Sequence, residues 1–275
     1  MNKNVLEISG VSVEQLAATC KTPLYVYDEN KIRQQLSMYH ELFQSKDFDT
    51  EVLYASKAFS CKAMVELVKT YGLSLDVVSG GELFTAYQAG FPMERVYFHG
   101  NNKSYEELEM AVKYGVGTII IDNDMECDAL VSIMKNAGTS IKTMLRVNPG
   151  VEAHTHKYIV TAHVDSKFGI SILREQEIAD MIHKLTSIPN ITFEGFHSHI
   201  GSQIFDKEAY VAEIGNLCEF MKIMQERFGI TCSSLNLGGG FAAYYTQADH
   251  PIPLQDVCKT ILDTCKAQKE ARSEE

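Results

Sequence analysis

Short apolar runs alternate with longer amphipathic stretches along most of the chain. The runs are rich in Val, Ile, Leu and Tyr, and they predict seven strands, at residues 51–58, 73–79, 95–99, 117–122, 142–147, 191–197 and 233–237. The stretches between them carry apolar residues at three- and four-residue spacing, which predicts helices at 61–71, 81–89, 104–114, 125–136, 207–227 and 253–269. This alternation is typical of repeated strand–helix units around a parallel sheet.

Polar residues gather at the carboxyl end of every predicted strand. In a β/α barrel these ends all converge on one site, whereas an open doubly wound sheet concentrates function at its switch point and leaves several strands uninvolved. The pattern therefore favours an α/β fold of the TIM type, a β/α barrel. The polar residues concerned are Lys57, Asp76, Ser79, His99, Asn101, Asp122, Arg146, Asn148, His197, His199 and Gly238–Gly240.

The barrel predicted in this way is incomplete, because it has seven of the eight strands that closure requires. We expect residues 51–275 to form a barrel that stops before its last strand, with unpaired edges at the gap. We expect residues 1–50 to form a strand at Pro23–Asp28 and a helix at Glu29–Phe43 that lead into the barrel.

Composition and charge exclude several classes of protein. The 275 residues are 45% hydrophobic, enough for a large core, and the net charge of −11 argues against binding to nucleic acid. The seven cysteines form no C-x-x-C pair, which argues against a disulfide framework or a zinc site. No apolar segment is long enough to cross a membrane, and the start of the chain lacks an apolar signal region. We therefore expect a soluble, cytoplasmic protein.

Two motifs point to a phosphate-bearing ligand that reacts with an amine. Lys57 follows the first predicted strand, where partial burial would favour the free amine that forms Schiff bases; a surface lysine at the start of a loop is the alternative. Gly238, Gly239 and Gly240 follow the seventh strand, where phosphate sites of barrels are frequent. Their backbone N–H groups would be able to approach a phosphate, although a tight turn would also explain one or two of the glycines.

Other polar residues leave more than one interpretation open. His197 and His199 share a face of the sixth strand without a third metal ligand nearby, so we predict no metal site. His199 is suited to stacking on an aromatic ring and Ser202 to donating to a phosphate, whereas a structural role is preferred for His197. Arg146 is expected to pair with Asp76, with a substrate carboxylate, or in a purely structural ion pair.

The long segment between the fifth and sixth strands, Val151–Phe168, carries three histidines. Long loops of this kind tend to be functional. The spacings between His154, His156 and His163 match no compact set of metal ligands, so we expect these side chains to line a cavity or lie on the surface.

Taken together, these motifs resemble the fold-type III decarboxylases that depend on pyridoxal phosphate (PLP), the group that includes the diaminopimelate, ornithine and arginine decarboxylases. The resemblance covers most of the chain, from Thr22 to Phe241, and the Asp-Ser-Lys-Phe-Gly-Ile and His-Ile-Gly-Ser-Gln motifs look most like the diaminopimelate branch. The motifs that carry it are Tyr-Ala-Ser-Lys-Ala, Asp-Val-Val-Ser-Gly-Gly-Glu, Arg-Val-Asn-Pro-Gly, Asp-Ser-Lys-Phe-Gly-Ile, His-Ser-His-Ile-Gly-Ser-Gln and Asn-Leu-Gly-Gly-Gly-Phe.

The resemblance implies specific roles for residues of this sequence. Lys57 would form the Schiff base with PLP, His199 would stack on the pyridine ring, and Ser202 and Gly238–Gly240 would hold the phosphate. Asp76 and Arg146 are candidates for the layer of residues behind these groups. The implied reaction is decarboxylation of meso-diaminopimelate to L-lysine, in a family whose members pair as homodimers with shared active sites.

The resemblance also implies a departure from the family. Members continue for well over a hundred residues more, with the last barrel strand, a Glu-Pro-Gly-Arg segment and a carboxyl-terminal β-domain that this sequence does not contain. We therefore expect the 275 residues alone to show little or no decarboxylase activity. The alternatives are a decarboxylase of the arginine, ornithine or carboxynorspermidine type, and a non-catalytic barrel that binds PLP or a partner protein.

Overall fold

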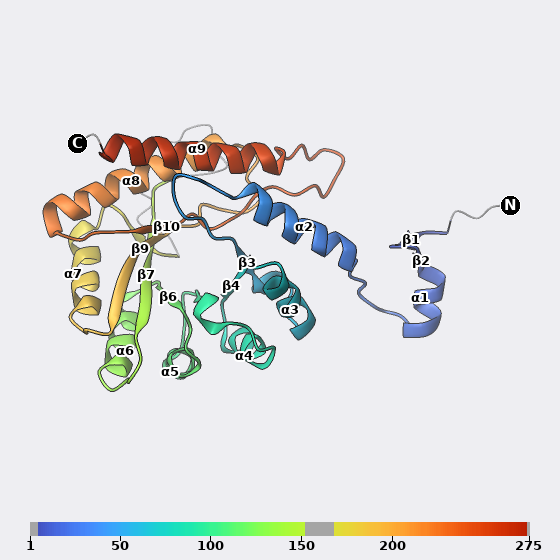
Figure 1. Cartoon of the computed structure of the whole chain (residues 1–275), viewed down its shortest axis with the longest axis horizontal. Coiled ribbons are helices and arrows are strands. Elements are labelled where there is room, and N and C mark those ends of the chain that lie inside the picture. Colours follow the sequence, from blue (N-terminus) through green and yellow to red (C-terminus); the bar gives the residue numbers. More distant parts are fainter. Residues whose placement is uncertain (1–4, 152–167, 274–275) are drawn as a thin grey trace.

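A curved sheet of parallel strands forms the centre of the molecule and helices lie around it (Figure 1). This arrangement is seen in a computed structural model that describes residues 5–151 and 168–273. The strand order is β10-β9-β7-β6-β5-β4-β3, with every neighbouring pair parallel. The strands are β3 (Leu53–Ala55), β4 (Ser74–Val77), β5 (Val96–Phe98), β6 (Thr118–Ile121), β7 (Ile141–Asn148), β9 (Ile191–His197) and β10 (Ser234–Asn236).

These seven strands are the seven that the sequence predicts, in the same order, and the prediction of an incomplete β/α barrel is confirmed. Among the described residues, β3 and β10 each have one strand neighbour, so the sheet stays open between them. The six predicted helices also form, with every end within two residues of its expected position except the end of α9, which lies four residues further on. They are α3 (Lys62–Thr70), α4 (Gly80–Gln88), α5 (Tyr105–Tyr114), α6 (Asp124–Met134), α8 (Glu208–Phe228) and α9 (Leu254–Ser273).

Two elements between the fifth and sixth barrel strands were not predicted. Strand β8 (Ile170–Ser171) pairs with the end of β7, outside the main strand order. Helix α7 (Glu175–Thr186) completes the strand–helix alternation before β9, and it buries Ile178, Ile182 and Leu185 against the core.

The core lies between the sheet and the helices and explains why the apolar runs become strands. All four residues of β6 are buried, as expected for a strand covered on both faces. At Gly195 the β9 backbone comes so close to β10 that a Cβ atom would lie 1.9 Å from the carbonyl oxygen of Ser234. Glycine is therefore the residue that permits this strand pair to form.

The amino-terminal region differs from its prediction. The expected strand at Pro23–Asp28 does not form, and Tyr25 is 93% exposed. The reason is that no strand lies beside this segment in the described chain, and an isolated extended segment has no ladder of hydrogen bonds to hold it. A small hairpin, β1 (Glu7–Ile8) and β2 (Val11–Ser12), and helix α1 (Val13–Cys20) precede it, away from the sheet (Figure 1).

The helix expected at Glu29–Phe43 is confirmed as α2 (Glu29–Leu42), which runs beside α9 (Figure 1). Asp28 caps its amino terminus and also accepts a hydrogen bond from the Ser9 hydroxyl. Leu36 is buried in the main core and Tyr39 packs against Phe241. Helix α2 thus joins the amino-terminal region to the loop that follows β10.

Three successive helices use the same device to hold the loops at the carboxyl edge of the sheet. In α4, α5 and α6 the third residue is a glutamate that follows a Ser or Asn cap. Each carboxylate accepts a backbone N–H from its own loop and a second donor from the preceding strand–helix loop. Glu82 accepts from Val78 N and Ser56 Oγ, Glu107 from Ser104 N and Gly80 N, and Glu126 from Asp122 N and Lys103 N.

Glu126 also forms the most deeply buried ion pair of the described chain. Its carboxylate lies 2.9 Å from Nζ of Lys103, and both side chains are almost fully excluded from solvent. Nζ donates two further hydrogen bonds, to the carbonyl oxygens of Gly100 and Ile120. Burial lowers the pKa of Lys103, and the Glu126 carboxylate opposes that shift.

We predict that Glu126→Ala lowers the free energy of unfolding by about 3–5 kcal/mol, because it leaves the buried Lys103 ammonium without its counter-charge. Urea denaturation at neutral pH measures the loss. Glu109→Ala, at an exposed position of α5, is the matched control and should change stability by less than about 0.5 kcal/mol. Equal stabilities of the two variants would contradict the prediction.

Candidate active site at the carboxyl edge of the sheet

Lys57 lies in a single 3-10 turn, Ser56–Ala58, directly after edge strand β3. Ser56 before it is buried, and its hydroxyl donates to Glu82. The side chain of Lys57 is exposed, so the partial burial expected from the sequence is not found in the described chain. Its charge nevertheless acts on two other predicted site residues, Asp76 and His199, and the three therefore share one region.

Asp76, in β4, is the acidic group of this region. Burial raises the pKa of Asp76 to about 7, against the opposing effects of Lys57, His199 and Arg146. Its side chain is 17% exposed, and Oδ1 lies 3.9 Å from Nδ1 of His99. A carboxyl group with this pKa exchanges its proton near neutral pH, which is unusual for an aspartate.

Arg146, in β7, lies behind Asp76 in a buried polar cluster. Its guanidinium is 3.5 Å from Oδ1 of Asp122 and 3.1 Å from Nε2 of His99, and it also covers the ring of Phe168 at 4.7 Å. The structure therefore contains the structural ion pair, with Asp122, and not a pair with Asp76, although the charge of Arg146 acts on Asp76. Burial and then Arg146 lower the pKa of His99 to about 3, so His99 is neutral.

His197, at the end of β9, is buried and makes an edge-on ring contact with His99, with centroids 4.6 Å apart. Burial lowers the pKa of His197 well below its usual value, and the ring is therefore neutral. The structural role preferred for His197 stays a prediction.

His199 lies two residues further on, against the glycine loop that follows edge strand β10. The backbone N–H of Gly239 donates to Nδ1 of His199 at 3.3 Å. Burial, followed by the charge of Lys57, lowers the pKa of His199 to about 4. The ring is therefore neutral at physiological pH, with its proton on Nε2 as the Gly239 contact requires.

The fold requires two of the three glycines in the loop after β10. Gly238 and Gly240 have positive φ, and a Cβ atom would lie 2.6 Å from the Ser198 carbonyl oxygen at Gly238 and 2.0 Å from that of Gly201 at Gly240. Chain geometry therefore explains both. A Cβ atom at Gly239 would meet nothing within 4 Å, so the fold itself does not explain this glycine.

Ser202 is exposed on a turn that is hydrogen-bonded to the glycine loop. Next to it, the side-chain amide of Gln203 donates to Ala243 O and accepts from Ala243 N. The backbone N–H of Ile204 donates to Gly240 O at 2.9 Å. The structure therefore brings Ser202 and Gly238–Gly240 to the same edge as His199.

The sequence analysis missed two polar residues of α8 that hold this region from behind. Tyr210 donates to Gly239 O at 3.2 Å, and Glu213 accepts a hydrogen bond from the hydroxyl of Ser198, between the two histidines. They occur at three-residue spacing among apolar residues of the helix, on its buried face. Polar residues within the apolar stripe of a helix are the sequence signal that would have found them.

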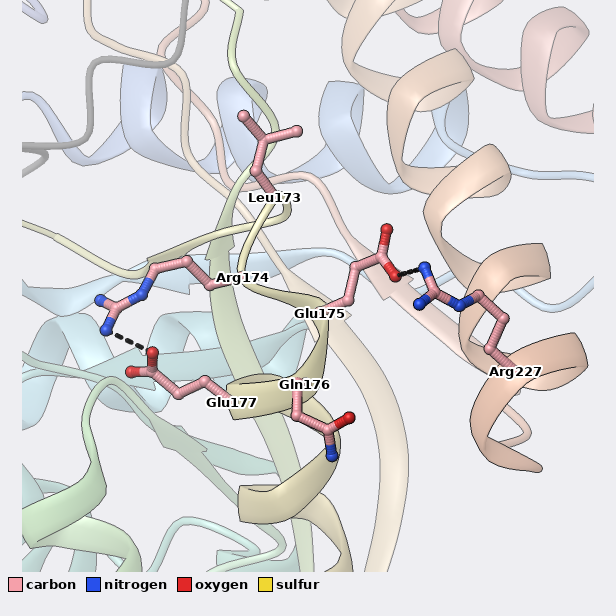
Figure 2. Close-up of a pocket in the computed structure, with 6 residues that line it drawn as sticks. All are labelled: Leu173, Arg174, Glu175, Gln176, Glu177 and Arg227. Atoms are coloured by element: carbon pink, nitrogen blue, oxygen red, sulfur yellow. Dashed lines mark hydrogen bonds and ion pairs between the residues drawn. The ribbon is translucent and has the colours of Figure 1, made fainter.

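A hollow in the surface lies at the start of α7, and none of the site residues described above lines it. Arg174 and Arg227 line it, and each is paired with a glutamate of α7, Glu177 and Glu175 respectively (Figure 2). Neither arginine is available to a ligand without breaking its ion pair, so this hollow is not the candidate site.

The remaining expectations concern the three histidines after the fifth predicted strand, metal ligands and membrane spans. His154, His156 and His163 lie outside the described residues. Within residues 5–151 and 168–273, no group of three His, Cys, Asp or Glu side chains is placed to hold a metal ion. No helix in these ranges is both long and apolar enough to span a bilayer.

We predict that Asp76→Asn makes the chain increasingly more stable than the wild type as pH rises from about 4 to about 7. In this interval unfolded Asp76 is ionised while folded Asp76 keeps its proton, since its pKa is raised from 3.8 to about 7. The contribution of Asp76 to wild-type stability therefore falls as pH rises, and asparagine lacks this contribution. Urea denaturation across this range tests it, with Asp180→Asn at an exposed position as control. A difference that does not vary with pH would contradict it.

Comparison with known proteins identifies a family for this chain. The family model described as "Pyridoxal-dependent decarboxylase, pyridoxal binding domain" matches residues 29–274. A diaminopimelate decarboxylase of Halalkalibacterium halodurans is 45% identical over 97% of this chain, and one of Bacillus subtilis is 44% identical over 95%. The chain spans about 60% of the length of these relatives.

Solved structures show the same similarity. The diaminopimelate decarboxylase from M. jannaschii in complex with L-lysine has a TM-score of 0.87 and 30% identity, covering 98% of this chain and 63% of that one. The corresponding Helicobacter pylori complex with L-lysine has a TM-score of 0.80 and 30% identity, covering 92% and 62%. This chain therefore belongs to the family of pyridoxal-dependent decarboxylases and contains its pyridoxal-binding domain.

Proposed function

We propose that residues at the carboxyl edge of the sheet bind PLP, with Lys57 as the amine that reacts with it. The observation that carries this proposal is the convergence of Lys57, Asp76, His199 and the glycine loop, from four separate strands, on one region. Lys57 lies two residues after Ala55, which pairs with Asp76, and His199 contacts the glycine loop through Gly239. The charge of Lys57 also acts on the pKa of both Asp76 and His199.

The glycine loop fits a phosphate group. A side chain at Gly239 would lie in open space, so the fold itself does not require a glycine there. The exposed hydroxyl of Ser202 lies on the turn bonded to the same loop, and a phosphate would be able to occupy the space between them. The backbone N–H groups of Gly238 and Gly239 already donate to Asn236 and His199, so support for a phosphate site comes from the open space at Gly239 and the Ser202 hydroxyl.

The other residues prepare the site for a flat, electron-poor ring. When bound, PLP supplies the electron sink that stabilises a carbanion, which is chemistry of the cofactor itself. His199 is neutral, so its ring is suited to stacking without adding positive charge. Asp76 exchanges its proton near neutral pH and is therefore able to hold or release a proton next to Lys57. Arg146, fixed by Asp122, keeps positive charge behind Asp76.

For the whole protein we propose decarboxylation of meso-diaminopimelate to L-lysine. Support comes from the diaminopimelate decarboxylases among its relatives, two of them solved with L-lysine. We further propose that residues 1–50 lead into a PLP-binding barrel at residues 51–275, that the protein pairs as a homodimer with shared active sites, and that it acts in the cytoplasm. Release of CO2 from meso-diaminopimelate, compared with L-ornithine and L-arginine, tests the substrate once the part of the B. subtilis relative that this chain does not span is supplied.

Trapping of the cofactor tests the role of Lys57 directly. The purified chain is mixed with PLP, reduced with borohydride, digested and analysed by mass spectrometry. We expect the reduced PLP adduct on the peptide that contains Lys57, and we expect Lys57→Ala to abolish it. Lys62→Ala, at an exposed position of α3, is the matched control and should leave the adduct in place. An adduct spread over many surface lysines would overturn the proposal.

The glycine loop allows a separate test of the phosphate site. We predict that Gly239→Ala weakens PLP binding by about tenfold or more, because the added methyl group enters the space proposed for the phosphate, and ~1.4 kcal/mol corresponds to tenfold. Its thermal stability should stay close to that of the wild type, because the methyl group meets no protein atom within 4 Å.

The matched control is Gly215→Ala in α8, where an added Cβ also meets nothing within 4 Å. We expect this variant to bind PLP like the wild type. Titration of PLP followed by absorbance measures both affinities. Unchanged affinity in Gly239→Ala would place the phosphate elsewhere.

A further inference from the structure

Helix α8 contacts two segments of the proposed PLP site, the end of β9 and the glycine loop after β10. Tyr210 donates to the carbonyl oxygen of Gly239, and Glu213, one turn further along the same face, accepts from the hydroxyl of Ser198. Ser198 immediately precedes His199, and Gly239 donates its N–H to the ring of His199. The two contacts of α8 therefore act on the two segments whose relative position sets the His199–Gly239 contact.

Ser198 is fixed on three sides. Its backbone N–H donates to Asn236 O at 2.8 Å, which extends the pairing of β9 with β10 by one residue. Its carbonyl oxygen lies against Gly238, where a Cβ atom would be only 2.6 Å away. The hydroxyl is held by Glu213, and neither Ser198 nor Glu213 is exposed to solvent. A change at Glu213 is therefore transmitted to the backbone that carries His199.

We propose that Glu213 is a positioning residue for the PLP site, which orients His199 through Ser198 and does so in its protonated form. This inference rests on the proposed function, because it assigns His199 and the glycine loop to the cofactor. Glu213 itself touches neither.

The surroundings of Glu213 explain why the neutral form is required. Oε1 accepts from Ser198, whereas Oε2 is buried without a hydrogen-bond partner among the described residues. A buried carboxylate with one hydrogen bond is costly, and its ionisation would favour movement of α8 that lets water reach it. Such a movement would release Ser198.

The groups around Glu213 do not change their charge in the pH range in which Glu213 titrates. Burial raises the pKa of Glu213 to about 8, and the Ser198 hydrogen bond opposes this shift. The titratable groups that Glu213 influences are Tyr210 on its own helix and Cys265 on α9. The pKa of Cys265 is raised to about 11 and that of Tyr210 is also raised, so both are neutral near pH 8. His199, beyond Ser198, has a pKa of about 4 and is already neutral there.

The experiment compares the dissociation constant for PLP in wild type and Glu213→Gln across a pH series. Glutamine keeps an acceptor for Ser198 and does not ionise. If only the protonated form positions the site, the wild-type constant rises about tenfold relative to that of Glu213→Gln one pH unit above the pKa of Glu213, and the two agree well below it. Any pH dependence of the cofactor itself affects both proteins equally and cancels in the ratio.

Two further variants separate positioning from overall stability. Ser198→Ala removes the link and should weaken PLP binding by about tenfold at neutral pH, the equivalent of one buried hydrogen bond to an ionisable group. Glu213→Ala should weaken it as well, and Glu213→Gln should restore it. Glu219→Gln, at an exposed position of α8, is the matched control and should match the wild type at every pH. Circular dichroism confirms that each variant is folded.

The outcomes distinguish this inference from the proposed function. A ratio that stays constant with pH, together with wild-type affinity in Ser198→Ala, would overturn the role of Glu213 while the PLP site stands. Absence of PLP binding in the folded wild type would overturn both. Should Glu213→Ala fail to fold, the pH series of Glu213→Gln and the affinity of Ser198→Ala decide the question.

Discussion

The hydrogen bonds made by the glutamates at the third position of α4, α5 and α6 are the constraint on which the site depends. Each carboxylate joins its own loop to the preceding one, so the loops from β3 to β6 form one connected edge. Glu82 reaches Ser56, next to Lys57, while Glu126 fixes Asp122 and Lys103. Loops held only by their own turns would have more conformational freedom, and every side chain they present would be less defined.

Burial of many ionisable groups in one edge makes their protonation states interdependent. Burial, followed by the charges of Arg146 and Lys103, lowers the pKa of His99 and keeps it neutral. Asp76 remains near its midpoint at neutral pH because burial outweighs the attraction of the cations. Neutral histidines and a half-protonated carboxyl group leave little fixed negative charge beside Lys57. The edge therefore repels an anionic ligand less than the net charge of −11 would indicate.

Sequence patterns predicted the seven barrel strands and the order in which they contribute polar residues. They could do so because each short apolar run is followed by a stretch with the periodicity of a helix. Partners could not be predicted in the same way. Arg146 pairs with Asp122, which follows the neighbouring strand β6, and not with Asp76 in the more distant β4. The strand expected at Pro23–Asp28 lacked a neighbour to pair with. The role of Glu213 depends on which face of α8 packs against Ser198. The spacing of apolar residues predicts the buried face of the helix, but it does not predict which polar group a residue on that face will contact.

The position of the candidate site on an open sheet has a physical consequence. Lys57 follows β3 and the glycine loop follows β10, the two strands that end the described sheet. Their separation is set by the accumulated curl of the strands between them, not by a direct ladder of hydrogen bonds. A ligand attached to Lys57 and held at Gly239 would span this gap and favour the curvature that it requires. Ligand binding and closure of the sheet would then stabilise each other, as linkage demands of any ligand that binds one conformation.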